Sequence, residues 1–149
     1  IADFDSEQYL KYIKTESGSK TVVGIEDGSL SVFTGRKGFW EDAAEYSFKK
    51  GVPLSDFGFV TFETLAPFAA LAGFNGENGE KLYISRSSRG VTVKERKDGR
   101  YEWTVDIEER LKDSTDNTFT TDTVIKGMSF TAAAANAEAV FDEIYFRNR

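Results

Sequence analysis

The chain has 149 residues, of which 40% are hydrophobic and 14% aromatic, and its formal net charge is -6. That length fits one domain built around a single core, and the aromatic content excludes a disordered tail. The negative charge argues against a nucleic-acid partner, because such binding depends on Lys and Arg neutralising phosphates.

Two residue types that carry much of enzyme chemistry are missing, since the sequence contains neither His nor Cys. Their absence excludes Ser-His-Asp and Cys-His catalysis, disulfides and the common Cys or His metal sites. Hydrolysis by paired carboxylates remains open. No apolar run reaches the roughly 20 residues of a bilayer span, so no membrane partner is expected. A start at Ile1 rather than Met favours a cut-out module or a mature secreted product.

The first predicted elements are a short helical turn and a hairpin. Asp5 can cap a turn within residues 5–13, in which Tyr9 and Ile13 share one face. Strands are predicted at residues 21–25 and 30–34, on either side of an Asp-Gly turn.

Alternation of apolar and polar side chains predicts the further strands. The clearest is the β-branched and aromatic run at residues 58–65. Polar loops are expected at residues 75–80 and 112–122, and the tail at residues 139–146 fits a strand better than a helix. The remaining predicted strands are residues 44–50, 81–86, 91–94, 101–107 and 124–131.

At least eight short strands separated by Gly- and Asp-rich turns predict an all-β fold. We expect an antiparallel β-sandwich of jelly-roll type over residues 1–149, with at most one or two short helical turns. Both ends carry a Phe-Asp step, Phe4-Asp5 and Phe141-Asp142, in apolar segments. This similarity predicts that the two termini pair side by side.

Six segments together resemble a known group of proteins: Phe4-Asp5, Gly28–Val32, Leu54–Gly58, Trp103–Ile107, Lys126–Phe130 and Phe141–Phe146. Over nearly its whole length the chain resembles the β-sandwich carbohydrate-binding modules appended to bacterial plant-cell-wall glycoside hydrolases. The resemblance implies a non-catalytic, secreted or cell-surface monomer that binds β-glucan, cellulose, xyloglucan or a similar polysaccharide. It also implies a glycoside hydrolase as the covalently linked partner.

Sugar binding requires aromatic planes for the C–H faces of the rings, with hydrogen-bonding groups beside them. Trp40 lies in a Gly-flanked, charged loop beside Glu41 and Asp42, and is either such a platform or a core residue that the loop covers. Tyr83 lies on the strand face opposite Leu82 and Ile84, and is either part of a cleft or an ordinary surface residue.

Tyr46 and Trp103 are further candidates, although their apolar neighbours on the same strand faces favour core packing. Glu102 then points to the opposite face, where its carboxylate can accept hydrogen bonds from sugar hydroxyls. Arg86, with Arg96 and Arg100, offers planar guanidinium groups that pair with uronate carboxylates, against the alternative of a solvated surface.

The resemblance also implies a structural calcium ion near the paired termini, with Asp5 and Asp142 as ligands by position. Calcium takes about six to eight oxygen ligands, so two acids are a sparse set, and surface carboxylates are the alternative.

Two other functions stay open. One is an adhesin or surface-assembly domain, which should expose a sizeable apolar patch. The other is a small glycosidase or lyase that uses Glu63 and Glu102. A glycosidase needs two carboxyl groups about 5–5.5 Å apart for retention, or about 6.5–9.5 Å apart for inversion.

Overall fold

The computed structural model describes residues 3–15, 20–35, 40, 43–65, 70–113, 118–134 and 136–148. Within these ranges the chain forms two antiparallel sheets and three short helical segments, so the all-β prediction is confirmed. None of the helices described is long and apolar enough to cross a bilayer. The elements are η1 (Glu7–Tyr12), β1 (Ile13–Thr15), β2 (Val22–Glu26), β3 (Ser29–Phe33), β4 (Ala44–Pro53), η3 (Leu54–Asp56), β5 (Phe59–Thr64), β6 (Ala70–Gly76), β7 (Lys81–Ile84), β8 (Val91–Glu95), β9 (Tyr101–Asp106), α1 (Ile107–Leu111), β10 (Val124–Ala132) and β11 (Glu138–Arg147).

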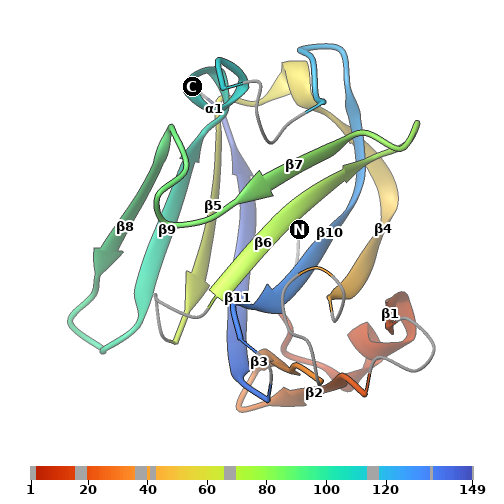
Figure 1. Cartoon of the computed structure of the whole chain (residues 1–149), viewed down its shortest axis with the longest axis vertical. Coiled ribbons are helices and arrows are strands. Elements are labelled where there is room, and N and C mark those ends of the chain that lie inside the picture. The colour runs from red at the N-terminus through yellow and green to blue at the C-terminus, as the bar shows by residue number, and fades with distance from the viewer. Residues whose placement is uncertain are drawn as a thin grey trace.

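The strands form a five-stranded sheet in the order β1-β4-β10-β6-β7 and a six-stranded sheet in the order β2-β3-β11-β5-β9-β8. Neighbours such as β4 and β10 are far apart in sequence, as in a jelly roll. Figure 1 shows β6 and β7 crossing over β5 and β11 of the other layer. Each sheet therefore has an inner face toward the shared core and an outer face.

The inner faces meet in a core rich in aromatic rings. Trp103 is fully buried, stacks on Phe62 with ring centroids 5.2 Å apart, and donates its Nε1–H to Thr64 Oγ1 at 2.9 Å. Phe130 of β10 meets Phe141 of β11 with ring centroids 4.7 Å apart. The first contact links neighbouring strands of the six-stranded sheet, and the second joins the two sheets, because each ring comes from the inward-pointing half of an alternating strand.

The N-terminal segment differs from the prediction. Residues 3–6 form no strand, and β11 pairs with β3 and β5 instead. Phe4, at φ 51°, is fully buried and packs edge-on against Tyr46 with ring centroids 5.8 Å apart. The expected pairing of the termini is therefore wrong for the described residues, because Phe4 fills the core instead of continuing a sheet.

Strand β7 is held by residues that lie later in the chain. Arg110 of α1 is buried, and its Nε and Nη2 donate to the carbonyl oxygen of Tyr83 at 3.0 and 2.6 Å. The backbone N–H of Lys81 donates to Thr118 Oγ1 at 2.9 Å, and the N–H of Thr118 donates to the carbonyl of Lys81 at 2.9 Å. These bonds fix the strand that carries Tyr83.

Candidate functional site

Two half-buried aromatic rings meet on the outer face of the five-stranded sheet. Tyr83 points away from the core, since its neighbours Leu82 and Ile84 are buried. Trp40 comes from the segment between β3 and β4, and its ring centroid lies 4.7 Å from that of Tyr83. The structure thus brings together two of the aromatic residues that sequence analysis named as candidates. Glu41 and Asp42 lie outside the described residues.

Gly73 of β6 makes room for the indole ring. Gly73 is opposite Tyr83 in the sheet register. A Cβ atom built on Gly73 would lie 3.5 Å from both Cη2 and Cζ3 of Trp40, which is ordinary contact distance. Trp40 therefore rests against the β6 backbone, next to the phenol ring of Tyr83.

The register places one residue from each of the five strands in a single row across this face: Tyr83, Gly73, Ser129, Glu45 and Lys14. Gly73 and Ser129 on the two inner strands are small. At the far edge, Lys14 Nζ lies 3.7 Å from Glu45 Oε2. The row thus begins with aromatic rings, continues over a floor of small residues and ends at an ion pair.

A chain of hydrogen bonds runs beside the rings. Lys81 Nζ donates to Asn75 Oδ1 at 2.7 Å, and Asn75 Nδ2 donates to Ser129 Oγ at 3.0 Å. Asn75 and Ser129 are 6% and 7% exposed, so these groups are held in fixed positions. An ammonium, an amide and a hydroxyl next to aromatic planes are the groups that sugar hydroxyls need.

We expect Gly73→Val to displace the Trp40 ring, because a branched side chain would occupy the place of the indole. Gly73→Ala is the matched control, since its Cβ would make only ordinary contact with the ring. Acrylamide quenching of tryptophan fluorescence measures the effect, with the buried Trp103 as a constant background. Quenching that is the same in both variants and the parent would contradict this packing.

Two of the predicted binding residues belong to the core. Tyr46 is 5% exposed and Trp103 is 0% exposed, and burial raises the pKa of Tyr46 to about 12. A sugar cannot stack on either ring in this fold, so we remove both from the candidate site. The apolar neighbours of Tyr46 and Trp103 on the same strand faces had correctly indicated that both rings pack in the core.

The remaining predicted residues lie on both sides of the molecule. Arg86 is exposed in the turn after β7, three residues beyond Tyr83, and remains a candidate at the rim of the aromatic pair. Glu102 is on β9 of the other sheet, so it cannot share a site with Trp40.

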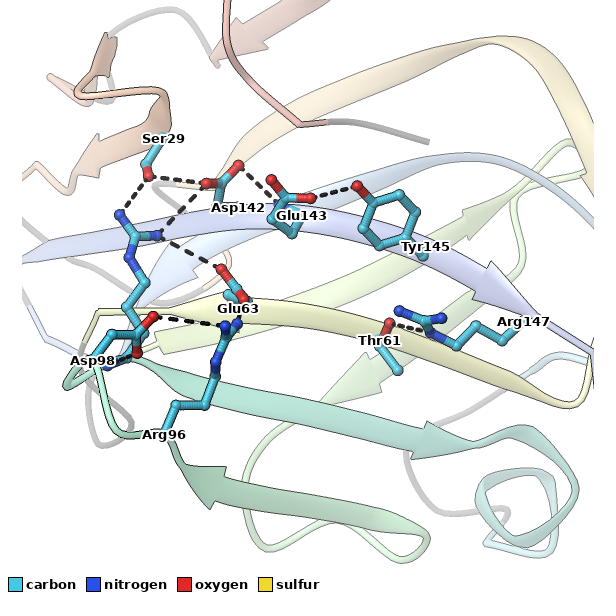
Figure 2. Close-up of polar contacts among 10 residues, drawn as sticks. Ser29, Thr61, Glu63, Arg96, Asp98, Asp142, Glu143, Tyr145 and Arg147 are labelled. Atoms are coloured by element: carbon cyan, nitrogen blue, oxygen red, sulfur yellow. Dashed lines mark hydrogen bonds and ion pairs between the residues drawn. The ribbon is translucent and has the colours of Figure 1, made fainter.

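An ionic network covers the outer face of the six-stranded sheet (Figure 2). Glu102, Glu63 and Asp142 are successive neighbours in register on β9, β5 and β11, and such like charges destabilise a sheet. Arg96 pairs with Glu63, while Arg100 Nη1 lies 3.6 Å from Asp142 Oδ2 and 3.9 Å from Glu63 Oε2. The two guanidinium groups are thus engaged by Glu63 and Asp142, so we do not assign uronate binding to them.

A polar hollow of about 390 Å³ lies beside this network. On its wall, the Tyr145 hydroxyl donates to Glu143, and Arg147 Nε donates to Thr61 Oγ1 at 3.0 Å (Figure 2). Glu63 also lines the hollow but is ion-paired with two arginines. Because Glu63 is held by these ion pairs, Glu63 and Glu102 do not form the free pair of carboxylates that the glycosidase hypothesis requires.

Asp142, one of the two predicted calcium ligands, is already engaged by groups of the protein. Asp142 accepts hydrogen bonds from Ser29 Oγ at 3.3 Å and from the Glu143 N–H at 2.9 Å, and it faces the Arg100 cation. Within the described ranges, no three acidic side chains gather where they could hold a metal ion. We derive no role for calcium.

Burial raises the pKa of Asp142 to about 6, and the nearby Glu143 charge adds to this, while a backbone hydrogen bond and Arg100 oppose it. The folded chain thus binds this proton more tightly than the unfolded chain, so stability falls as pH rises from about 4 to about 6.

We expect Asp142→Asn to stabilise the protein above pH 6 by up to ~3 kcal/mol, with the gain disappearing near pH 4. Urea unfolding between pH 4 and 7 measures it, with the exposed Asp122→Asn as control. If the parent is more stable than Asp142→Asn at pH 7, the raised pKa of Asp142 is refuted.

Sequence reasoning missed Gly73, Asn75, Lys81 and Ser129. Strand β6 was not predicted, because Asn75-Gly76 was interpreted as the start of a turn and the preceding residues are mostly small. Only the pairing register of the sheet places these four residues in one site with Tyr83.

A scan of the sequence against models of known protein families finds no match, and no curated protein matches. Solved structures do match. A variant of a family 29 carbohydrate-binding module is 10% identical with a TM-score of 0.60, covering 96% of this chain and 86% of its own. A family 11 carbohydrate-binding module from Clostridium thermocellum, in complex with a β-1,3-1,4-mixed-linked tetrasaccharide, is 15% identical with a TM-score of 0.51, covering 91% and 87%.

An exo-β-agarase is 11% identical with a TM-score of 0.54, and the match covers all of this chain but 24% of the agarase. These likenesses show that the fold is the β-sandwich found in carbohydrate-binding modules, as the sequence resemblance implied.

Proposed function

We propose that this chain is a non-catalytic module that binds polysaccharide on the outer face of its five-stranded sheet. The observation that carries the proposal is the Trp40–Tyr83 ring pair, 4.7 Å between centroids, beside the hydrogen-bonded row of Lys81, Asn75 and Ser129. The fold shared with carbohydrate-binding modules supports the same function.

The rings stack on the C–H faces of one or two sugar units, and the polar row meets their hydroxyls. The sheet is four strand spacings wide from β1 to β7, which is about 19 Å at about 4.8 Å each. The sheet can therefore contact several sugar units of a glycan that lies across the strands. We expect an oligosaccharide to bind more tightly than a monosaccharide.

Among neutral glycans, mixed-linkage β-glucan is our first choice of ligand, since a matching family 11 module is in complex with such a tetrasaccharide. Cellulose and xyloglucan remain within the same proposal. The module would act outside the cell by tethering a linked glycoside hydrolase to its substrate, which raises local concentration without tight affinity.

Affinity electrophoresis and calorimetry on mixed-linkage β-glucan, xyloglucan, xylan, pectin and agarose test the proposal. We expect retardation on at least one of them, with no release of reducing ends. Free migration on all five would reject glycan binding, whereas reducing-end release would point to the glycosidase or lyase alternative.

The adhesin alternative requires a sizeable apolar patch. Among the described residues, the exposed large hydrophobic side chains are Val22, Phe33, Leu65 and Tyr145. Val22 and Phe33 are neighbours in register, but two side chains are a small patch. We therefore favour the glycan over a protein partner.

A further inference from the structure

A second hollow, of about 420 Å³, lies at the β1–β4 edge of the five-stranded sheet. Its wall is built from η1 and β4, and it carries the rings of Tyr9, Tyr12 and Phe48. The aromatic pair of Trp40 and Tyr83 lies at the opposite edge of the same sheet. Tyr46 and Phe48 point from β4 toward the inner side of the sheet, so the hollow is separate from the site described above and does not share its outer face.

Three lysines surround this hollow: Lys11, Lys49 and Lys50. All three are exposed, and Lys11 Nζ and Lys49 Nζ lie 5.3 and 5.4 Å from the centroid of the Tyr12 ring. Among the side chains that the structure describes, no carboxylate forms an ion pair with any of them, whereas Lys14 and Lys112 are paired. The nearest described acid bonded to a residue of this wall is Asp3, which accepts from the Tyr9 hydroxyl at 3.1 Å.

This concentration of positive charge is unusual for the chain. The protein carries a net charge of -6, and on the other sheet Arg96 and Arg100 are neutralised by Glu63 and Asp142. Three ammonium groups around one hollow repel one another, and an anion bound there would relieve that repulsion. Aromatic rings beside the charges suit a sugar unit better than a free inorganic anion.

We infer that this hollow binds an anionic unit of the polysaccharide, so that the ligand of the module is a glycan bearing carboxylate or sulfate groups. The inference rests on the proposed function, because it assigns the hollow to the same polysaccharide. Lysine is a point charge without the fork of arginine, so the hollow accepts either anion. The acidic-sugar hypothesis made for the arginines thus applies to these lysines instead.

The test compares four probes by calorimetry at low and high salt: polygalacturonate, ι-carrageenan, neutral mixed-linkage β-glucan and a thymidine oligonucleotide. The variant is Lys11→Gln/Lys49→Gln/Lys50→Gln. The matched control is Lys94→Gln/Lys97→Gln/Lys112→Gln, which removes the same charge from other exposed positions. Thermal unfolding confirms that both variants fold.

At low salt we expect one of the two anionic glycans to bind about ten-fold more tightly than the neutral glycan, and the advantage to disappear in high salt. The hollow variant should lose that advantage, while the control keeps it within about two-fold. Tighter binding of polygalacturonate identifies carboxylate as the anion, and tighter binding of carrageenan identifies sulfate.

Three outcomes would overturn the inference. One is equal affinity of the parent and the hollow variant for the anionic glycan. Another is stronger binding of the oligonucleotide with the same lysine dependence, which would indicate nucleic acid. The third is binding of the neutral glycan alone, which would leave the proposed function standing. If Trp40→Ala leaves every glycan affinity unchanged, the proposed function itself fails.

Discussion

Replacing Trp40 with alanine should weaken polysaccharide binding about 30-fold or more, because aromatic anchors at binding sites typically contribute at least about 2 kcal/mol. Tyr83→Ala should have a smaller effect in the same direction, since Tyr83 is the smaller ring and supports the indole. Calorimetry with the glycan that retards the parent most strongly in affinity electrophoresis measures both changes.

Phe33→Ala is the matched control for these variants. Phe33 is 43% exposed on β3 of the other sheet, so its loss removes an exposed ring without touching the five-stranded sheet. If Phe33→Ala weakens binding as much as Trp40→Ala does, the glycan lies on the six-stranded sheet and our site is misplaced. All three variants should keep the stability of the parent to within about 1 kcal/mol, because none of the rings is a core residue.

Trp103→Ala is expected to have the largest effect on stability, a loss of about 3–5 kcal/mol. The substitution removes the stacked partner of Phe62 and leaves a cavity between the sheets. It also leaves the buried Thr64 hydroxyl without the hydrogen bond that it accepts from the indole N–H. Urea or guanidinium unfolding followed by circular dichroism measures the loss.

Trp103→Phe separates packing from the hydrogen bond, because it keeps much of the ring but removes the donor. Its cost should lie well below that of alanine, and it remains measurable if the alanine variant does not fold. A loss under about 1 kcal/mol for Trp103→Ala would show that the sheets do not pack on this ring.

The sequence predicted the strands wherever alternation was regular. β5, β9, β10 and β11 were placed within two residues of their observed ends, because their inward halves carry large apolar side chains. Strand β6 was missed because its outward positions hold residues that pack locally rather than alternate: Gly73 leaves room for Trp40, and Asn75 bonds across to Ser129. A period of two is hard to detect in a strand whose outward residues are glycine and asparagine.

The candidate site was predictable in part, and the reason lies in long-range register. Trp40 and Tyr83 stood out as aromatic residues outside the apolar pattern, and the structure places them together. Their polar neighbours come from β6 and β10, which no local pattern connects. In the same way, the ion pairs of Arg96 with Glu63 and of Arg100 with Asp142 could not be predicted, because these acids lie on β5 and β11.

The bonds that Arg110 and Thr118 make to β7 have one further consequence. β7 is an outermost strand, and such strands offer unpaired backbone groups to a strand of another molecule. Here the guanidinium of Arg110 donates hydrogen bonds to the Tyr83 carbonyl. Thr118 accepts a hydrogen bond from the amide of Lys81 and donates one to its carbonyl. These bonds therefore protect the β7 edge from pairing with a strand of another copy.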